Sequence, residues 1–221
     1  MNQEIKNIGI IIHLLKKEIK SFESPISAEI GVETKDPFLV LISCILSLRT
    51  KDTTTGPAAK RLFALAGNPK DMLKLTKKQI EKAIFPVGFY PTKAKYILKT
   101  CKALVNDYSG KVPDKEEELL KLSGIGRKCM GIVMCYGFNK SSHIPVDTHV
   151  HKIANRLGWG KTKTPEKTEF ALMKIISKKY WRGLNNLLVA HGQNICVSVS
   201  PFCSKCCITS YCPRIGVKKS R

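Results

Sequence analysis

Four cysteines near the C-terminus constrain the folding of this 221-residue chain more than any other feature. Cys196, Cys203, Cys206 and Cys212 follow the spacing C-x6-C-x2-C-x5-C. Four thiolates in so short a segment repel one another unless a cation compensates their charge, so the pattern predicts a four-cysteine metal site. The spacing repeats neither the paired C-x2-C of most structural zinc sites nor that of ferredoxins, so zinc and iron–sulfur ligation are both open at this point. Because Cys206 gives the better spacing, we expect its neighbour Cys207 not to be a ligand.

The charge of the chain is strongly basic. Lysine and arginine number 38 against 17 aspartate and glutamate residues, which leaves a net charge of +21. Such a surface attracts polyanions and is typical of nucleic-acid binding, although a general preference for lysine explains the same excess. The basic residues are spread along the whole chain, so we expect them on folded faces rather than in a tail.

The hydrophobic pattern is helical throughout. Apolar residues recur at helical spacing, no segment alternates strictly, and Pro37, Pro91 and Pro165 lie where helices begin, so we predict an all-α fold. The expected helices cover residues 4–22, 36–50, 53–66, 77–85, 92–108, 115–121, 127–136, 147–157, 165–179 and 183–196. No apolar run approaches the roughly 20 residues that a membrane span needs, and no secretory signal is evident. We therefore expect an intracellular protein, in which cysteines bind metal or pack before they form disulfides.

A glycine turn stands between two of the expected helices, in the sequence Leu122-Ser123-Gly124-Ile125-Gly126. Two glycines in this arrangement allow a tight turn that points backbone N–H groups outward from a helix N-terminus, a geometry that binds phosphate without reading base sequence. The pattern therefore predicts the hairpin of a helix–hairpin–helix module. The alternative is an ordinary turn between two helices.

Two residues that follow the hairpin are candidates for chemistry. Lys128 lies in the first turn of the next helix, where the helix dipole and Arg127 disfavour the ammonium form, which makes it a candidate amine nucleophile. A solvated or phosphate-binding lysine is the alternative. Asp147 precedes a later helix and is placed to be its N-cap, and the same carboxylate is a candidate proton acceptor or stabiliser of positive charge on a sugar. The nearby His149 and His151 are expected to pack or form hydrogen bonds rather than bind metal.

The motifs taken together, in this order, resemble the endonuclease III family of helix–hairpin–helix DNA glycosylases. The resemblance rests on Leu-x-Gly-x-Gly-Arg-Lys, then Val-Asp-Thr-His, then the four cysteines, and extends upstream through Leu46-Ser47, Thr50-Lys51-Asp52 and Gly88-Phe89-Tyr90. It implies a two-domain fold: a six-helix barrel, which we place at residues 28–141, and an iron–sulfur domain built from both termini, residues 1–27 and 142–221.

The same resemblance implies a function. The expected activity is that of a bifunctional DNA glycosylase and AP lyase of base excision repair that removes damaged bases, with oxidised pyrimidines as the family default. Lys128 would be the Schiff-base nucleophile, Asp147 the assisting carboxylate, and the four cysteines the ligands of a [4Fe–4S] cluster. The expected partner is double-stranded DNA with a damaged base or an abasic site, bound by a monomer that works in the cytoplasm or nucleoid. The expected DNA contacts are Leu122, Gly124, Ile125, Gly126, Arg127, Arg49, Phe89 and Tyr90.

The chain departs from the family pattern in three places. Arg49 stands where glutamine is common at the position that fills the gap left by the flipped base, and Phe89 stands where a second wedge residue is often leucine. Cys129-Met130-Gly131 replaces the usual Thr-Ala-Asn after the lysine. Because these positions bear on opposite-base preference and on the range of lesions, the sequence leaves both open.

Two other functions explain part of the pattern. A monofunctional mismatch glycosylase of the same fold activates water with the aspartate and lacks the lysine, so Lys128 argues against it. A non-catalytic DNA-binding module with a four-cysteine zinc site explains the hairpin, the charge and the cysteines. That alternative leaves the joint presence of Lys128 and Asp147 without a reason.

Overall fold

The computed structural model describes residues 7–22, 30 and 33–221, and every regular element among them is helical. This confirms the all-α prediction. The described residues divide into two compact units, each with its own hydrophobic core. One unit is the described part of the chain from residue 30 to Ser142, and the other joins residues 7–22 to His143–Arg221. None of the described helices has both the length and the apolar character needed to cross a membrane.

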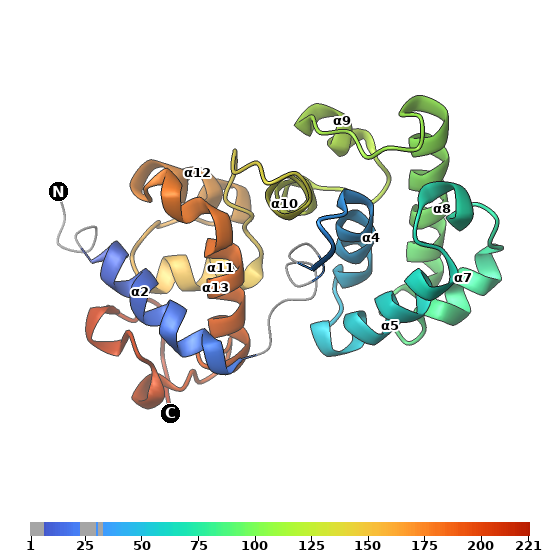
Figure 1. Cartoon of the computed structure of the whole chain (residues 1–221). Helices are drawn as coiled ribbons and strands as arrows, with labels where there is room; N and C mark the ends of the chain where they lie inside the picture. Colours follow the sequence, from blue (N-terminus) through green and yellow to red (C-terminus); the bar gives the residue numbers. More distant parts are fainter. Residues whose placement is uncertain (1–6, 23–29, 31–32) are drawn as a thin grey trace. The chain divides into compact units, whose positions relative to one another are not determined.

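The first unit contains the hairpin. Its elements are α4 (Pro37–Ser47), α5 (Asp52–Leu65), α6 (Pro69–Met72), α7 (Lys77–Ile84), α8 (Tyr90–Asp107), α9 (Glu116–Lys121), α10 (Arg127–Ile132) and the π-helical turn η2 (Val133–Gly137). Helix α4 lies at the centre, because it packs against α5, α8, α10 and η2 (Figure 1). Leu41, Ile42 and Ile45 of α4 are fully buried, as its nearly continuous apolar sequence requires.

The second unit brings distant parts of the chain together. Its elements are α2 (Ile8–Glu18), η1 (Ile19–Ser21), α11 (Thr148–Arg156), α12 (Pro165–Ile175), η3 (Lys178–Tyr180), α13 (Trp181–Asn194), η4 (Cys203–Lys205) and η5 (Thr209–Tyr211). Helix α13 packs against both α11 and α2, which Figure 1 shows in blue beside it. The buried face of α2, formed by Ile8, Ile11, Ile12 and Leu15, repeats at helical spacing.

The helix bounds differ from the expected ones where local chemistry intervenes. The short helix α6 was not expected, although Asn68 caps it and Pro69 begins it. The segment expected as one helix over residues 127–136 changes to π-helical hydrogen bonding after Ile132. In α13 the residues Arg182 and Gly183 are not helical, so its regular turns begin at Leu184, one residue after the expected start. The expected start of the first helix at residue 4 lies outside the described residues.

Candidate active site and nucleic-acid interface

The glycine turn joins α9 to α10, which pack against each other as a helix–hairpin–helix module. Gly124 has a φ of +82°, the left-handed conformation that glycine adopts without strain. A Cβ atom at this position would lie 2.8 Å from Cδ2 of Tyr96, so the ring of Tyr96 leaves no room for a side chain. Gly126 is the N-cap of α10 in extended conformation, and a Cβ there would meet nothing within 4 Å. The backbone therefore requires glycine at position 124, whereas at position 126 it leaves room for a side chain.

Helix α8 supports the turn from behind. Thr100 Oγ1 donates a hydrogen bond of 3.1 Å to the carbonyl of Ser123. The side chains of Leu122 and Ile125 are buried in the core of this unit, with exposed fractions of 4% and 7%. Both residues were expected to contact DNA. Because their side chains face the core, only their backbone groups are placed to do so.

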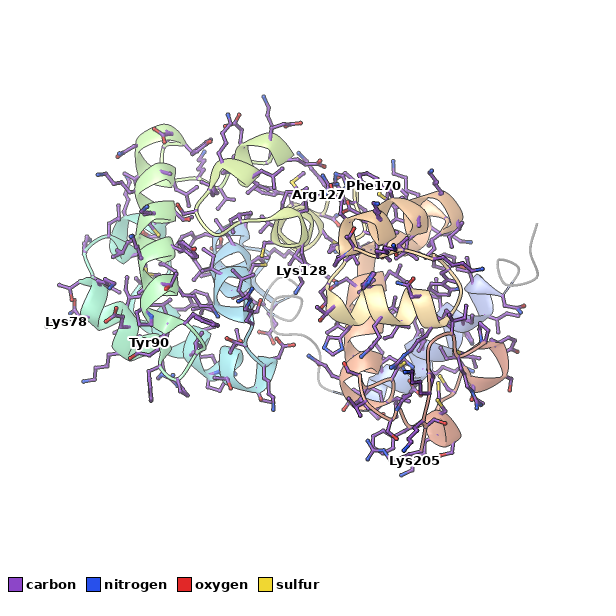
Figure 2. All side chains as sticks on the ribbon, turned by 180° about the vertical axis from the view of Figure 1, so that it is seen from behind. Lys78, Tyr90, Arg127, Lys128, Phe170 and Lys205 are labelled. Atoms are coloured by element: carbon purple, nitrogen blue, oxygen red, sulfur yellow. The ribbon has the colours of Figure 1, made fainter. Side chains whose placement is uncertain are left out.

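Lys128 is the second residue of α10, directly after Arg127, and Figure 2 shows both on this helix. Both side chains are half-buried. A hydrogen bond with Cys44 outweighs burial and, together with the charge of Lys128, lowers the pKa of the Cys129 thiol. Cys129 and Met130 belong to the core of the unit. Lys128 therefore lies at the edge of the apolar core of this unit.

Asp147 is the N-cap of α11, as expected from its place before that helix. Its Oδ1 accepts hydrogen bonds of 2.9 Å from the backbone N–H groups of His149 and Val150. These bonds satisfy two of the donors that a helix N-terminus leaves without partners inside the helix. Asp147 belongs to the second unit and Lys128 to the first. His151 forms a 2.6 Å hydrogen bond with Thr168, which fits a packing role.

The two expected wedge residues have the same unusual backbone. Arg49 and Phe89 are both exposed and both have a left-handed conformation, with φ of +52° and +58°. The guanidinium of Arg49 lies 5.9 Å from the centre of the Phe89 ring, whose side chain is 62% exposed. An exposed aromatic ring held in a strained loop conformation is unusual and often marks a functional position. Tyr90 is half-buried and packs edge-on against Phe85.

Lys93 is a buried lysine of α8 to which the sequence pattern assigned no role. Its exposed fraction is 3%, and burial lowers the pKa of its ammonium to about 8. Nζ donates to the carbonyl oxygens of Leu46, at 2.7 Å, and of Leu48, and to Thr50 Oγ1, at 2.9 Å. Lys93-Ala94 follows Gly88-Phe89-Tyr90 in the segment that resembles the family, but nothing in that pattern distinguishes a buried lysine from the many surface lysines.

The four expected ligand cysteines line one pocket of the second unit. Electrostatic repulsion from Cys196, Cys203 and Cys206 adds to burial in raising the pKa of Cys212, so the four sulfurs are close enough to interact. Within the described residues, no three possible ligands are arranged to hold one metal ion. Cys207 is exposed and does not line the pocket.

Two cationic side chains reach the sulfur atoms of this pocket. Arg156 Nη1 donates to Cys196 Sγ at 3.1 Å, and the same guanidinium also binds the carbonyls of Cys196, Val197 and Ser198. His191 lies 3.7 Å from Cys206 Sγ and pairs with Glu18 of α2. Although burial opposes its charge, hydrogen bonds with Cys196, Cys206 and Glu18 raise the pKa of His191 to about 11. This donor set suits anionic thiolates, so the residues present fit a cluster in which each thiolate binds its own metal atom better than they fit one metal ion that several ligands share.

Comparison with known proteins agrees with this arrangement. The model of the HhH-GPD superfamily of base excision DNA repair proteins matches residues 42–178. Endonuclease III of Thermotoga maritima is 45% identical over 177 residues, which cover 80% of this chain and 83% of that protein. The endonuclease III-like protein 1 of Gallus gallus is 40% identical over 178 residues, which cover 80% of this chain and 63% of the relative.

This chain belongs to the endonuclease III family. It is accordingly a DNA glycosylase and AP lyase of base excision repair. Its fold is similar to that of a trapped endonuclease III–DNA covalent intermediate, with a TM-score of 0.84, 30% identity and 97% of both chains covered. It is also similar to a thermostable thymine-DNA glycosylase, with a TM-score of 0.81, 25% identity and coverage of 96% of this chain and 97% of the other.

Proposed function

We propose that this member of the endonuclease III family removes oxidised pyrimidines from double-stranded DNA with Lys128 as its nucleophile. The observation that carries the proposal is the position of Lys128, at the start of the helix that follows the hairpin. A monofunctional enzyme of the same fold needs no amine there. The trapped covalent intermediate among the similar structures is that of an endonuclease III–DNA complex, which supports a covalent mechanism.

The chemistry follows from an amine at this position. The damaged base leaves the stack, which exposes C1′ of its sugar. Neutral Lys128 Nζ forms a bond to C1′ as the bond between C1′ and the base breaks, and the base leaves with a proton. The C1′–O4′ bond of the adduct then breaks, O4′ takes a proton, and the opened sugar is joined to the lysine as an imine. The imine acidifies the C2′ protons, and loss of one of them expels the 3′ phosphate by β-elimination. Asp147 is proposed to accept a proton or to stabilise positive charge on the sugar during these steps.

The DNA contacts are proposed to come from the hairpin and the wedge residues. The backbone of Leu122–Gly126, with Arg127, would bind phosphate oxygens at the N-terminus of α10. Arg49 and Phe89 would fill the space left by the extruded base, and their exposure fits that role. Tyr90 is proposed to contact the duplex beside them.

Borohydride trapping tests the nucleophile. With a duplex that contains an oxidised pyrimidine, borohydride should reduce the imine and leave a permanent protein–DNA crosslink. Lys128→Gln removes the amine at similar size and should abolish both the crosslink and strand cleavage, while DNA affinity changes little because phosphate contacts dominate affinity.

Lys121→Gln is the matched control. It is the same substitution in the same module, at a side chain that is 65% exposed and forms an ion pair with Glu118. It should retain the crosslink. A Lys128→Gln protein that still excises bases without cutting the strand would identify a water-activating enzyme. A wild-type protein that binds DNA but processes no lesion would identify a non-catalytic module.

We propose a [4Fe–4S] cluster as the group held by Cys196, Cys203, Cys206 and Cys212. When bound, such a cluster would fix the loop between its ligands and present it to DNA. The purified protein should be yellow-brown and contain about four irons per chain. Cys203→Ala should lose the colour and the iron, whereas Cys207→Ala should keep both, because Cys207 lies outside the pocket. A colourless protein with one zinc per chain would show that the cofactor assignment is wrong.

A further inference from the structure

The two wedge residues lie on different loops, and their side chains meet where the Arg49 guanidinium faces the Phe89 ring. Arg49 follows the end of α4, and Phe89 precedes α8. Each has a left-handed backbone, which is strained for a non-glycine residue and persists only where neighbouring contacts enforce it. Other contacts within this unit must therefore fix the positions of the two loops relative to each other.

Lys93 makes the hydrogen bonds that fix the loop after α4. An ammonium has three N–H donors, and those of Lys93 have three acceptors: the carbonyls of Leu46 and Leu48 and the hydroxyl oxygen of Thr50. The two carbonyls lie at the C-terminal end of α4, where carbonyl groups lack partners within the helix and where a cation is favourable. The three acceptors bracket Arg49 on both sides.

Thr50 extends the connection to the second loop. Its Oγ1 accepts a hydrogen bond of 3.1 Å from the backbone N–H of Gly88, the residue before Phe89. A Cβ atom on Gly88 would lie 3.1 Å from the Arg49 carbonyl oxygen and 3.2 Å from Thr50 Oγ1, so the two loops touch at this point. One hydroxyl thus joins Lys93, the loop of Arg49 and the loop of Phe89.

We propose that Lys93, acting through Thr50, is the positioning residue that sets the spacing between Arg49 and Phe89 and so allows both to enter the DNA stack together. This inference rests on the wedge roles in the proposed function. Lys93 itself is buried and touches no DNA in this arrangement. Its loss should impair displacement of the opposite base more than it impairs binding, because most of the affinity comes from phosphate contacts elsewhere.

Fluorescence of 2-aminopurine tests the inference without chemistry. The probe is a duplex that carries 2-aminopurine opposite a tetrahydrofuran abasic analogue, so that unstacking of the opposite base raises the fluorescence. Saturating wild-type protein should produce a clear increase. Lys93→Met keeps the length of the side chain without its charge, and should give about half of that increase or less, with an affinity within about threefold of wild type.

A second pair of variants makes the test independent of whether the Lys93→Met protein folds correctly. Thr50→Val removes the hydroxyl at constant size and should reproduce the loss, whereas Thr50→Ser retains the hydroxyl and should restore most of the increase. Combining Lys93→Met with Phe89→Ala should lower the signal no further than Phe89→Ala alone, because both act on one wedge.

The outcomes separate this inference from the proposed function. If the wild type gives no increase, or if Arg49→Ala and Phe89→Ala leave it unchanged, the wedge assignment itself is wrong. If those two variants lose the signal but Lys93→Met and Thr50→Val retain it, the wedge stands and the positioning role of Lys93 is overturned. Equal loss in Thr50→Ser and Thr50→Val would also overturn it.

Discussion

Asp147 already has a structural task, because one of its carboxylate oxygens accepts both hydrogen bonds that cap α11. Its proposed catalytic task needs the charge of the carboxylate, whereas capping needs only an acceptor at Oδ1. Asparagine supplies that acceptor without the charge, and alanine supplies neither. The two tasks can therefore be separated by two substitutions at one position.

We expect Asp147→Asn to unfold at the same denaturant concentration as the wild type while its single-turnover excision rate falls by roughly 10²–10⁴. Asp147→Ala should lose the same activity and also about 1 kcal/mol of stability, because the helix loses its cap. Urea unfolding and single-turnover kinetics on one lesion duplex measure both effects. Wild-type excision by Asp147→Asn would exclude a catalytic role for the charge.

Single residues were predictable where their task is local. Asp147 could be identified as a cap because it directly precedes a helix. The burial of Leu122 and Ile125 could not be predicted, since it depends on which face of the hairpin meets the core. The links of Lys93 to Thr50 and the α4 carbonyls join positions more than forty residues apart, which no local pattern records.

At the scale of elements, the two glycines of the hairpin have different roles: Gly124 meets a requirement of backbone conformation, and Gly126 is expected to leave space at the DNA interface. Gly124 has a positive φ and faces the Tyr96 ring, so Gly124→Ala should cost about 1–3 kcal/mol of stability. Gly126 is extended and faces open space, and asparagine is a favourable N-cap, so Gly126→Asn should leave stability unchanged within about 0.5 kcal/mol.

Measurement of DNA binding by the Gly126 variant then tests the DNA interface separately from protein stability. Gly126→Asn should weaken binding to damaged and undamaged duplex alike, because its side chain would occupy the space in which a phosphate meets the N-terminus of α10. Urea unfolding and fluorescence anisotropy are the measurements. Normal binding by this well-folded variant would make the hairpin a connector only.

Helix positions were predicted well where proline or a cap marks the boundary. Pro37, Pro91 and Pro165 each lie in the first turn of a helix in the structure. Prediction failed where hydrogen bonding changes without a change in apolar pattern. The π-helical turn after Ile132 retains buried side chains, so it leaves no periodicity signal.

At the scale of the whole molecule, the dominant property is the net charge of +21. Binding to duplex DNA should weaken steeply with salt, with log K falling by roughly 0.9 per log unit of salt for each phosphate neutralised. Arg127→Gln should reduce the slope by about one such contact and weaken binding to all sequences similarly. Anisotropy titrations at several salt concentrations measure the slope. A flat salt dependence would show that the charge is not used for DNA.

The construction of the second unit from two distant segments affects how the chain folds as it is synthesised. Helix α2 packs against α13, so its partner surface does not exist until residues 181–194 have been made. The core of the other unit, by contrast, uses one continuous stretch that ends by Ser142 and can form while the chain is still growing. The side chains of Ile11, Ile12 and Leu15 are therefore exposed to solvent, or bound by a chaperone, while the unit that follows them in the sequence folds first.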